Sequence, residues 1–176
     1  MIWLNMLSTL INILNNGGAP WQIAGGAALG FIIGTTPSFF MDLLVFFVLL
    51  VVNVNLGAAT FAIAIFKLLA HFIDPLLDVI GYRLLTSSGL HGFWTALYNT
   101  PLVPFTKFNN TIVLGSFVCS VIAAIPLFFL ARAGVAQYRA HVMGKLAETK
   151  FMKAYKMSGF YQWYRKVMNI RNVITQ

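Results

Sequence analysis

Charged residues are scarce in this chain of 176 residues: Asp, Glu, Lys and Arg make up 9%, and only four residues are acidic. Soluble domains average about 25% charged residues, because charged side chains cover a folded surface in water. Hydrophobic residues make up 59%, which excludes a disordered chain and predicts a protein whose surroundings are lipid. The same composition argues against a soluble nucleic-acid binder, despite a net charge of +8.

Cysteine is almost absent, since Cys119 is the single one, and this excludes a disulfide scaffold. The sequence also lacks a P-loop, an H-E-x-x-H motif, a nucleophile elbow and a C-x-x-C pair. We therefore expect no metal, no cofactor and no enzymatic activity. Cys119 has no charged neighbour to lower the pKa of its thiol, so it is interpreted as a packing residue.

The net charge is confined to one end of the chain. Residues 1–131 contain three basic and three acidic side chains, whereas residues 132–176 contain nine Lys or Arg and Glu148 alone. A neutral apolar body followed by a basic tail is typical of a membrane protein that follows the positive-inside rule. This pattern predicts a membrane domain over 17–131 and a cytoplasmic tail over 132–176.

One apolar stretch is long enough to cross a bilayer unaided. Residues 111–131 contain no charge, and about 20 such residues cross a hydrocarbon core of about 30 Å. Arg132 follows at once and places the C-terminal end of this span on the cytoplasmic side.

The other apolar stretches, 21–34, 38–52, 57–72 and 76–85, are each too short for a comfortable span. Polar residues separate them, with Pro37 and Pro75 as expected helix breaks. One interpretation is a set of short, kinked transmembrane helices. The other is two re-entrant hairpins, around Pro37 and Pro75, because broken helices at matching positions are typical of transporter-like sites.

Two further segments are expected at the lipid surface. Residues 1–16 carry apolar side chains at helical spacing and no charge, which predicts an interfacial amphipathic helix. The tail predicts a basic amphipathic helix that binds anionic headgroups, and nucleic acid is not expected as its partner. Its candidate surface residues are Lys150, Lys153, Lys156, Trp163, Arg165 and Lys166.

Three glycines, Gly26, Gly30 and Gly34, follow one another at four-residue spacing. Small residues on one stripe let helices approach closely in lipid, so we interpret this stripe as a packing surface. Ala58 and Ala62 form a matching stripe. A ligand-binding role for the glycines stays open, although no strand precedes them as a nucleotide fingerprint requires.

A small set of charged residues lies within the apolar body, where each charge costs at least about 2.5–3.5 kcal/mol. The candidates for an intramembrane polar path are Asp42, Lys67, His71, Asp74 and Asp78. The last four would line one face of a continuous helix, because they are spaced by three or four residues. They are interpreted as an internally neutralised cluster or as a proton or ion relay; a metal site is disfavoured because the set contains one histidine.

Several strings in the chain resemble the bacterial membrane family called domain of unknown function 2062. They are A-L-G-F-I-I-G-T-T-P (28–37), F-I-D-P-L-L-D (72–78) and G-Y-R-L-L-T (81–86). W-T-A-L-Y-N-T-P-L (94–102) and F-N-N-T-I-V-L-G-S (108–116) resemble a subfamily of short stand-alone members. The resemblance implies an inner-membrane location and supplies no catalytic residues. Genes of this subfamily often neighbour one for a larger membrane-anchored periplasmic protein, similar to bridge proteins that carry lipid.

Taken together, these features predict an all-α integral membrane protein of short, broken or re-entrant helices and one full-length span. We expect an inner-membrane subunit of an envelope complex that docks a larger periplasmic partner and assists phospholipid transfer toward the outer membrane. The alternative is a small secondary transporter or ion channel that uses the intramembrane Asp and His residues. A homo-oligomer is compatible with either function.

Overall fold

The computed structural model describes residues 9–15 and 18–142, and these residues form helices and turns without a strand. The chain divides into two units, 1–136 and 137–176. Of the second unit the structure describes Gln137 and the π-helical turn η3 (Tyr138–Val142). Of the expected N-terminal helix it describes residues 9–15, which are helical. The six candidate residues of the tail, from Lys150 to Lys166, lie outside the described residues.

The first two long helices form a hairpin. Helix α2 (Pro20–Thr35) begins with proline at a position where its missing N–H costs nothing, and the Gln22 side chain accepts from the Ala19 N–H at 2.9 Å. It ends at Thr35, and Thr36 is extended because a residue before proline disfavours the helical conformation. Helix α3 (Phe39–Val51) follows. The two helices lie where the apolar stretches 21–34 and 38–52 were expected, with the turn at Pro37.

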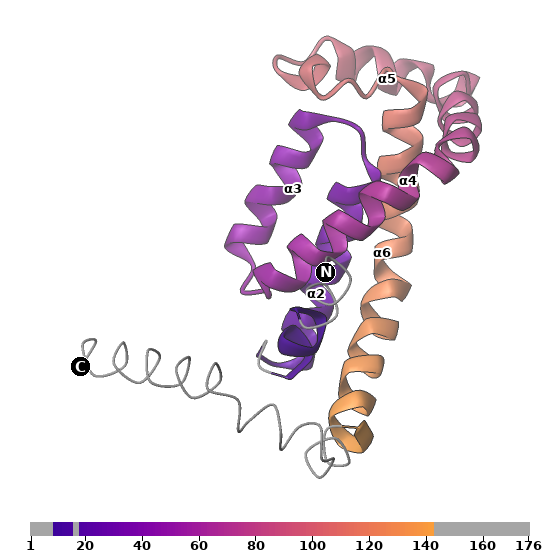
Figure 1. The fold of residues 1–176 in the computed structure, drawn as a ribbon. Helices are drawn as coiled ribbons and strands as arrows, with labels where there is room; N and C mark the ends of the chain where they lie inside the picture. The colour runs from indigo at the N-terminus through magenta and orange to yellow at the C-terminus, as the bar shows by residue number, and fades with distance from the viewer. Residues whose placement is uncertain (1–8, 16–17, 143–176) are drawn as a thin grey trace. The chain divides into compact units, whose positions relative to one another are not determined.

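Helix α4 (Leu56–Leu85) begins at Asn55, whose side-chain oxygen accepts from the Ala58 N–H at 2.7 Å. The expected break at Pro75 is wrong, because α4 continues through this residue as one helix. A proline inside a helix removes one hydrogen bond and bends the axis, and Figure 1 shows α4 changing direction along its length. The stretches 57–72 and 76–85 therefore belong to one bent helix, and no hairpin forms around Pro75.

A run of short elements leads from α4 to the last long helix. It contains η1 (Ser88–Leu90), α5 (His91–Tyr98) and η2 (Val103–Thr106). Figure 1 shows α5 lying across the end of the first unit at which α6 (Thr111–Gln137) begins. By length and composition, α4 and the helical stretch that begins at Thr111 are the two described helices able to cross a membrane.

Helices α2 and α4 pack side by side and run in the same direction. Gly26 lies against the backbone of Asn55 and Ala59, Gly30 against Ala59 and Ala62, and Gly34 against Ile63 and Phe66. The glycine stripe of the sequence is thus the surface on which α4 lies, and the alanines in closest contact are Ala59 and Ala62. Since a Cβ at Gly26 or Gly30 would meet backbone atoms, glycine is needed for this separation.

A second close approach joins α4 and α6, and the sequence did not predict it. Gly81 of α4 faces the Thr111 carbonyl, and Gly115 of α6 faces the Leu77 carbonyl and the Gly81 nitrogen. Two glycines from helices far apart in sequence therefore share one crossing point. This contact holds the second half of α4, beyond Pro75, against the start of α6.

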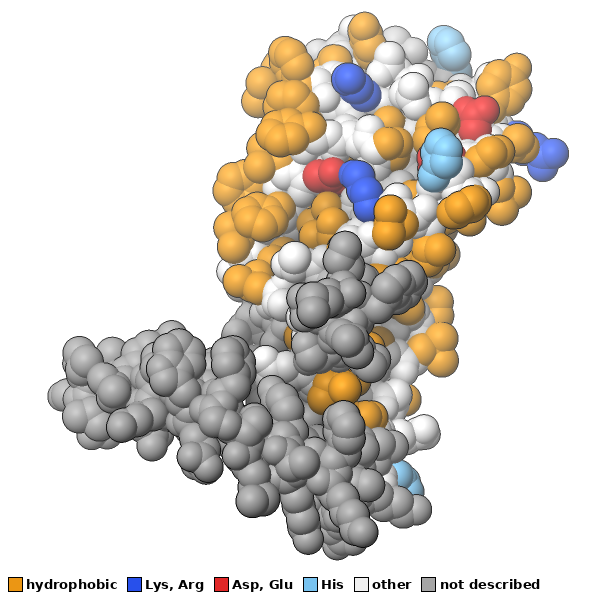
Figure 2. Space-filling view, viewed as in Figure 1, with side chains coloured by type: hydrophobic (Ala, Val, Ile, Leu, Met, Phe, Trp, Pro, Cys, Tyr) orange, Lys and Arg blue, Asp and Glu red, His pale blue; other side chains and the backbone are white. Residues whose placement is uncertain are grey.

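Large apolar side chains cover the surface of the described residues. Among the side chains coloured in Figure 2, hydrophobic ones are the most frequent and few are charged. Helices α3, α4 and α6 carry many of the exposed ones, including Phe39, Leu44, Phe47, Leu50, Leu68, Phe72, Leu76, Ile122, Ile125, Phe129 and Leu130. Soluble monomers rarely expose apolar patches larger than a few hundred Å².

Candidate functional site

The turn between α2 and α3, residues 36–38, is fixed by a long-range hydrogen bond. The Ser38 hydroxyl donates to the Thr106 carbonyl at 2.7 Å, which joins the turn to η2. Thr36, Ser38 and Thr106 are buried, and in the described part of the chain the Thr36 hydroxyl has no hydrogen-bond partner. We call residues 36–38 the hairpin tip.

An ion pair lies one helical turn after the hairpin tip. Lys67 Nζ of α4 is 3.7 Å from Asp42 Oδ2 of α3, and the side chains are 55% and 23% exposed. The Asp42 N–H donates to the Ser38 carbonyl at 2.9 Å, so Asp42 belongs to the first turn of α3. The positive end of the helix dipole favours a carboxylate there. The other carboxylate oxygen, Asp42 Oδ1, has no hydrogen-bond partner among the described residues.

The remaining charged residues of the expected polar path do not join this pair. Asp78 accepts a hydrogen bond from the Thr111 hydroxyl of α6, and His71 is exposed. Asp74 Oδ1 is buried and has no partner in the residues described. The four candidate residues of α4 lie on one continuous helix, but Lys67 is paired with Asp42 of α3 and Asp78 is hydrogen-bonded to Thr111 of α6. The relay along α4 stays a prediction.

A metal site is not formed by these residues. Within 9–15 and 18–142, no three His, Cys, Asp or Glu side chains lie close enough together to hold a metal ion. Sequence spacing along α4 gave no indication of either partner, Asp42 or Thr111, because both come from other helices.

The two ends of the first unit are distinguished by their contacts. At one end Asn55 N–H donates to the Gln22 carbonyl at 3.0 Å, and Ile23, Ala58 and Val135 form one buried cluster. The open end of the α2–α3 hairpin thus lies beside the C-terminal part of α6. At the other end Met41, Phe108 and Val113 pack together. The hairpin tip and the ion pair therefore lie toward the start of α6.

Both arms of the hairpin are short for a bilayer. At 1.5 Å per residue, the 16 residues of α2 are about 24 Å long and the 13 residues of α3 about 20 Å. A hydrocarbon core is about 30 Å thick. Helix α3 buries one stripe, Met41, Val45 and Leu49, and exposes most of its other side chains.

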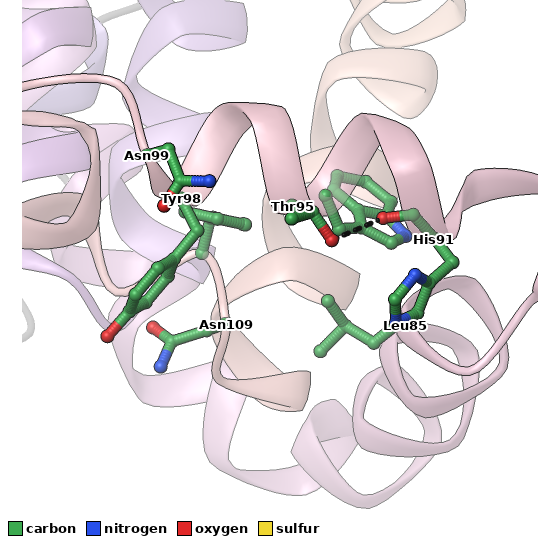
Figure 3. Close-up of a pocket in the computed structure, with 8 residues that line it drawn as sticks. Leu85, His91, Thr95, Tyr98, Asn99 and Asn109 are labelled. Atoms are coloured by element: carbon green, nitrogen blue, oxygen red, sulfur yellow. Dashed lines mark hydrogen bonds between the residues drawn. The ribbon is translucent and has the colours of Figure 1, made fainter.

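An open pocket lies on the segment between α4 and α6. Its volume is about 300 Å³, and Figure 3 shows His91, Thr95, Tyr98, Asn99 and Asn109 around it. The ring N–H of Trp94, which also lines it, donates to the Leu84 carbonyl at 2.9 Å and anchors α5 on the end of α4. Phe93 is exposed beside one lining residue, with its ring centroid 4.8 Å from that of Trp94. Leu102 and Phe105 are exposed elsewhere on the same segment.

Comparisons with known proteins agree with the resemblance seen in the sequence. The family described as "Uncharacterized protein conserved in bacteria (DUF2062)" matches residues 6–143. An "Uncharacterized protein" of Treponema pallidum (strain Nichols) is 28% identical over 141 residues, which cover 80% of this chain and 87% of the relative. No solved structure matches the chain.

Proposed function

We propose that this chain, which belongs to the DUF2062 family of bacterial proteins, is a non-enzymatic inner-membrane subunit that helps phospholipid leave the bilayer toward a larger periplasmic partner. The observation that carries this proposal is α3, an apolar helix of 13 residues that exposes most of its side chains. Its first turn carries Asp42, which is paired with Lys67 of α4.

Embedding follows from the exposed apolar side chains on α3, α4 and α6 and from the two helices long enough to cross. Lipid is the solvent that tolerates such a surface. By the positive-inside rule, the nine basic residues of 132–176 favour a cytoplasmic position for the C-terminal end of α6. The segment between α4 and α6 then faces the periplasm.

Thinning follows from the short hairpin. An apolar helix shorter than the hydrocarbon core draws the two surfaces of the bilayer together, at a cost of a fraction of a kcal/mol per Å. For α3, about 20 Å long, the mismatch is about 10 Å. Lipid beside α3 is therefore less well packed than elsewhere, which lowers the barrier to its removal.

Docking is assigned to the periplasmic segment 87–110. It offers an open pocket with polar groups from His91, Asn99 and Asn109, and it exposes Phe93 and Phe105. Aromatic residues beside a concave surface are typical of protein interfaces. The resemblance to a subfamily whose genes neighbour one for a larger periplasmic protein supports such a partner.

Deletion of the gene tests the proposal directly. We expect altered outer-membrane phospholipid content and higher permeability, restored by the wild-type gene. A Phe93→Ala/Phe105→Ala variant should restore neither, whereas Thr60→Ala, which changes an exposed hydroxyl of α4, should restore both. An envelope unchanged by deletion would contradict the proposal.

The alternative function is a small secondary transporter or ion channel, which needs a continuous polar path. Of the residues proposed for such a path, Lys67 is paired with Asp42 of α3 and Asp78 is hydrogen-bonded to Thr111 of α6, and this arrangement does not favour one continuous path. The alternative predicts that vesicles containing the protein move an ion or solute, with loss of transport on Asp74→Asn.

A further inference from the structure

We infer that the Asp42–Lys67 pair binds the headgroup of a zwitterionic phospholipid from the periplasmic leaflet, with the lipid phosphate at Lys67 and the headgroup ammonium at Asp42. This inference rests on the proposed function and names its substrate class. The ligand is thus a phosphodiester that carries its own amine, as in phosphatidylethanolamine.

The pair is accessible from an apolar surface. Lys67 is 55% exposed, and the residues that follow the two partners in the chain, Leu43 and Leu68, are exposed apolar side chains. Figure 2 shows an acidic and a basic side chain in contact, with hydrophobic side chains around them. In a membrane the molecules that reach this surface are lipids.

Neither partner uses its full binding capacity within the pair. A lysine ammonium has three donors, and here one carboxylate oxygen lies 3.7 Å from it. Asp42 keeps Oδ1 without a hydrogen-bond partner in the described part of the chain. In apolar surroundings an incompletely satisfied charge is costly, so a ligand that supplies both an anion and a cation lowers the free energy of both groups.

The charges select a zwitterion over an anion. A phosphate at Lys67 places a negative charge near the Asp42 carboxylate, and the headgroup ammonium offsets that repulsion by approaching Asp42. An anionic headgroup without an amine, such as that of phosphatidylglycerol, leaves the repulsion in place. The site therefore discriminates by headgroup charge.

The depth of the pair indicates the leaflet. Asp42 follows Ser38 by four residues, or about 6 Å of helix, and Ser38 is bonded to Thr106 in the periplasmic segment. Lys107, next to Thr106, is exposed and adds a cation at that surface. A headgroup at Asp42 and Lys67 thus lies about one helical turn below the periplasmic segment, already displaced into the short α3 region.

Lipid retention by the purified full chain tests this inference. The protein is placed in nanodiscs of equal phosphatidylethanolamine and phosphatidylglycerol, transferred to mild detergent, and analysed by native mass spectrometry for retained lipid. We expect wild type to retain phosphatidylethanolamine in excess. Asp42→Asn should shift the ratio toward phosphatidylglycerol by about fivefold, the effect of roughly 1 kcal/mol for a lone cation near anionic lipid.

Further variants separate loss of binding from loss of folding. Lys67→Gln should abolish the preference, and Lys67→Arg, which keeps the charge, should preserve it. Arg83→Gln, at an exposed cation on the same helix, is the matched control and should behave as wild type. An equal lipid ratio in wild type and Lys67→Gln would overturn the inference.

A competition experiment distinguishes binding of a lipid headgroup from binding of free phosphate. Inorganic phosphate added during transfer should not displace the retained lipid; displacement would mean that the pair is a site for free phosphate, and would overturn the inference. Because this assay uses the chain without a partner, its failure leaves the deletion phenotype as an independent test of the proposed function.

Discussion

The crossing of α4 and α6 at Gly81 and Gly115 allows a sharp test of the helix packing. A Cβ added at Gly115 would overlap the Leu77 carbonyl and lie 2.9 Å from the Gly81 nitrogen. Both obstacles are backbone atoms, so Gly115→Ala forces the two helices apart. Gly134 lies in the same helix with nothing within 4 Å of the position of its Cβ. Gly134→Ala is therefore the matched control.

The expected loss of unfolding free energy in Gly115→Ala follows from a comparison with Gly134→Ala. Each replaces glycine by alanine inside α6, so the gain in helix propensity of about 1 kcal/mol is common to both. The difference is the cost of overpacking, typically about 1–3 kcal/mol. We expect the unfolding free energy of Gly115→Ala to be lower than that of Gly134→Ala by at least this amount.

Unfolding by dodecyl sulfate in mixed micelles, followed by circular dichroism, measures this difference. The rate at which a maleimide labels Cys119, one turn after Gly115, gives a second measure and should rise in Gly115→Ala alone. Equal stability and equal labelling of the two variants would refute the close contact between α4 and α6.

Two other predictions concern the α2–α3 hairpin and the orientation of the chain in the membrane. Ser38→Ala should lower the unfolding free energy by about 1–3 kcal/mol, because it leaves the buried carbonyl that Ser38 contacts without a donor, whereas Thr60→Ala should change it by less than about 0.5 kcal/mol. The orientation in the membrane is tested in a Cys119→Ser background with an impermeant maleimide applied to spheroplasts. The reagent should label Gly89→Cys, on the periplasmic side, and should label Asn53→Cys only after lysis. The opposite labelling pattern would mean that the orientation is the reverse of the one proposed.

The bounds of α2 and α3 were readable from the sequence because local signals mark them. Proline at residues 20 and 37 and the Asn53–Asn55 turn act within a few residues of the helix ends. Proline also predicted a helix end at Pro75, and there the prediction was wrong. There, the contact of Gly81 with α6 lies beyond the proline and keeps the second half of α4 packed, so the chain bends without breaking.

The candidate site was predictable residue by residue but not in its pairing. Asp42 and Lys67 stand out because they are charged residues in apolar stretches of the sequence. Their contact, however, joins α3 to α4 and depends on how both helices pack against α2. Spacing along one helix instead suggested that Lys67 faces His71. The bond from Ser38 to Thr106 spans 68 residues and has no sequence signature, since serine and threonine are common in turns.

The most direct test of the central claim is to purify the chain from its own membrane in mild detergent and analyse protein and lipid together by mass spectrometry. A membrane subunit that passes phospholipid to a partner should carry bound phospholipid and a large membrane-anchored periplasmic protein in fixed ratio. Phe93→Ala/Phe105→Ala should lose the protein and keep the lipid. Recovery of the wild-type chain alone or as a homo-oligomer, without lipid or partner, would contradict the account.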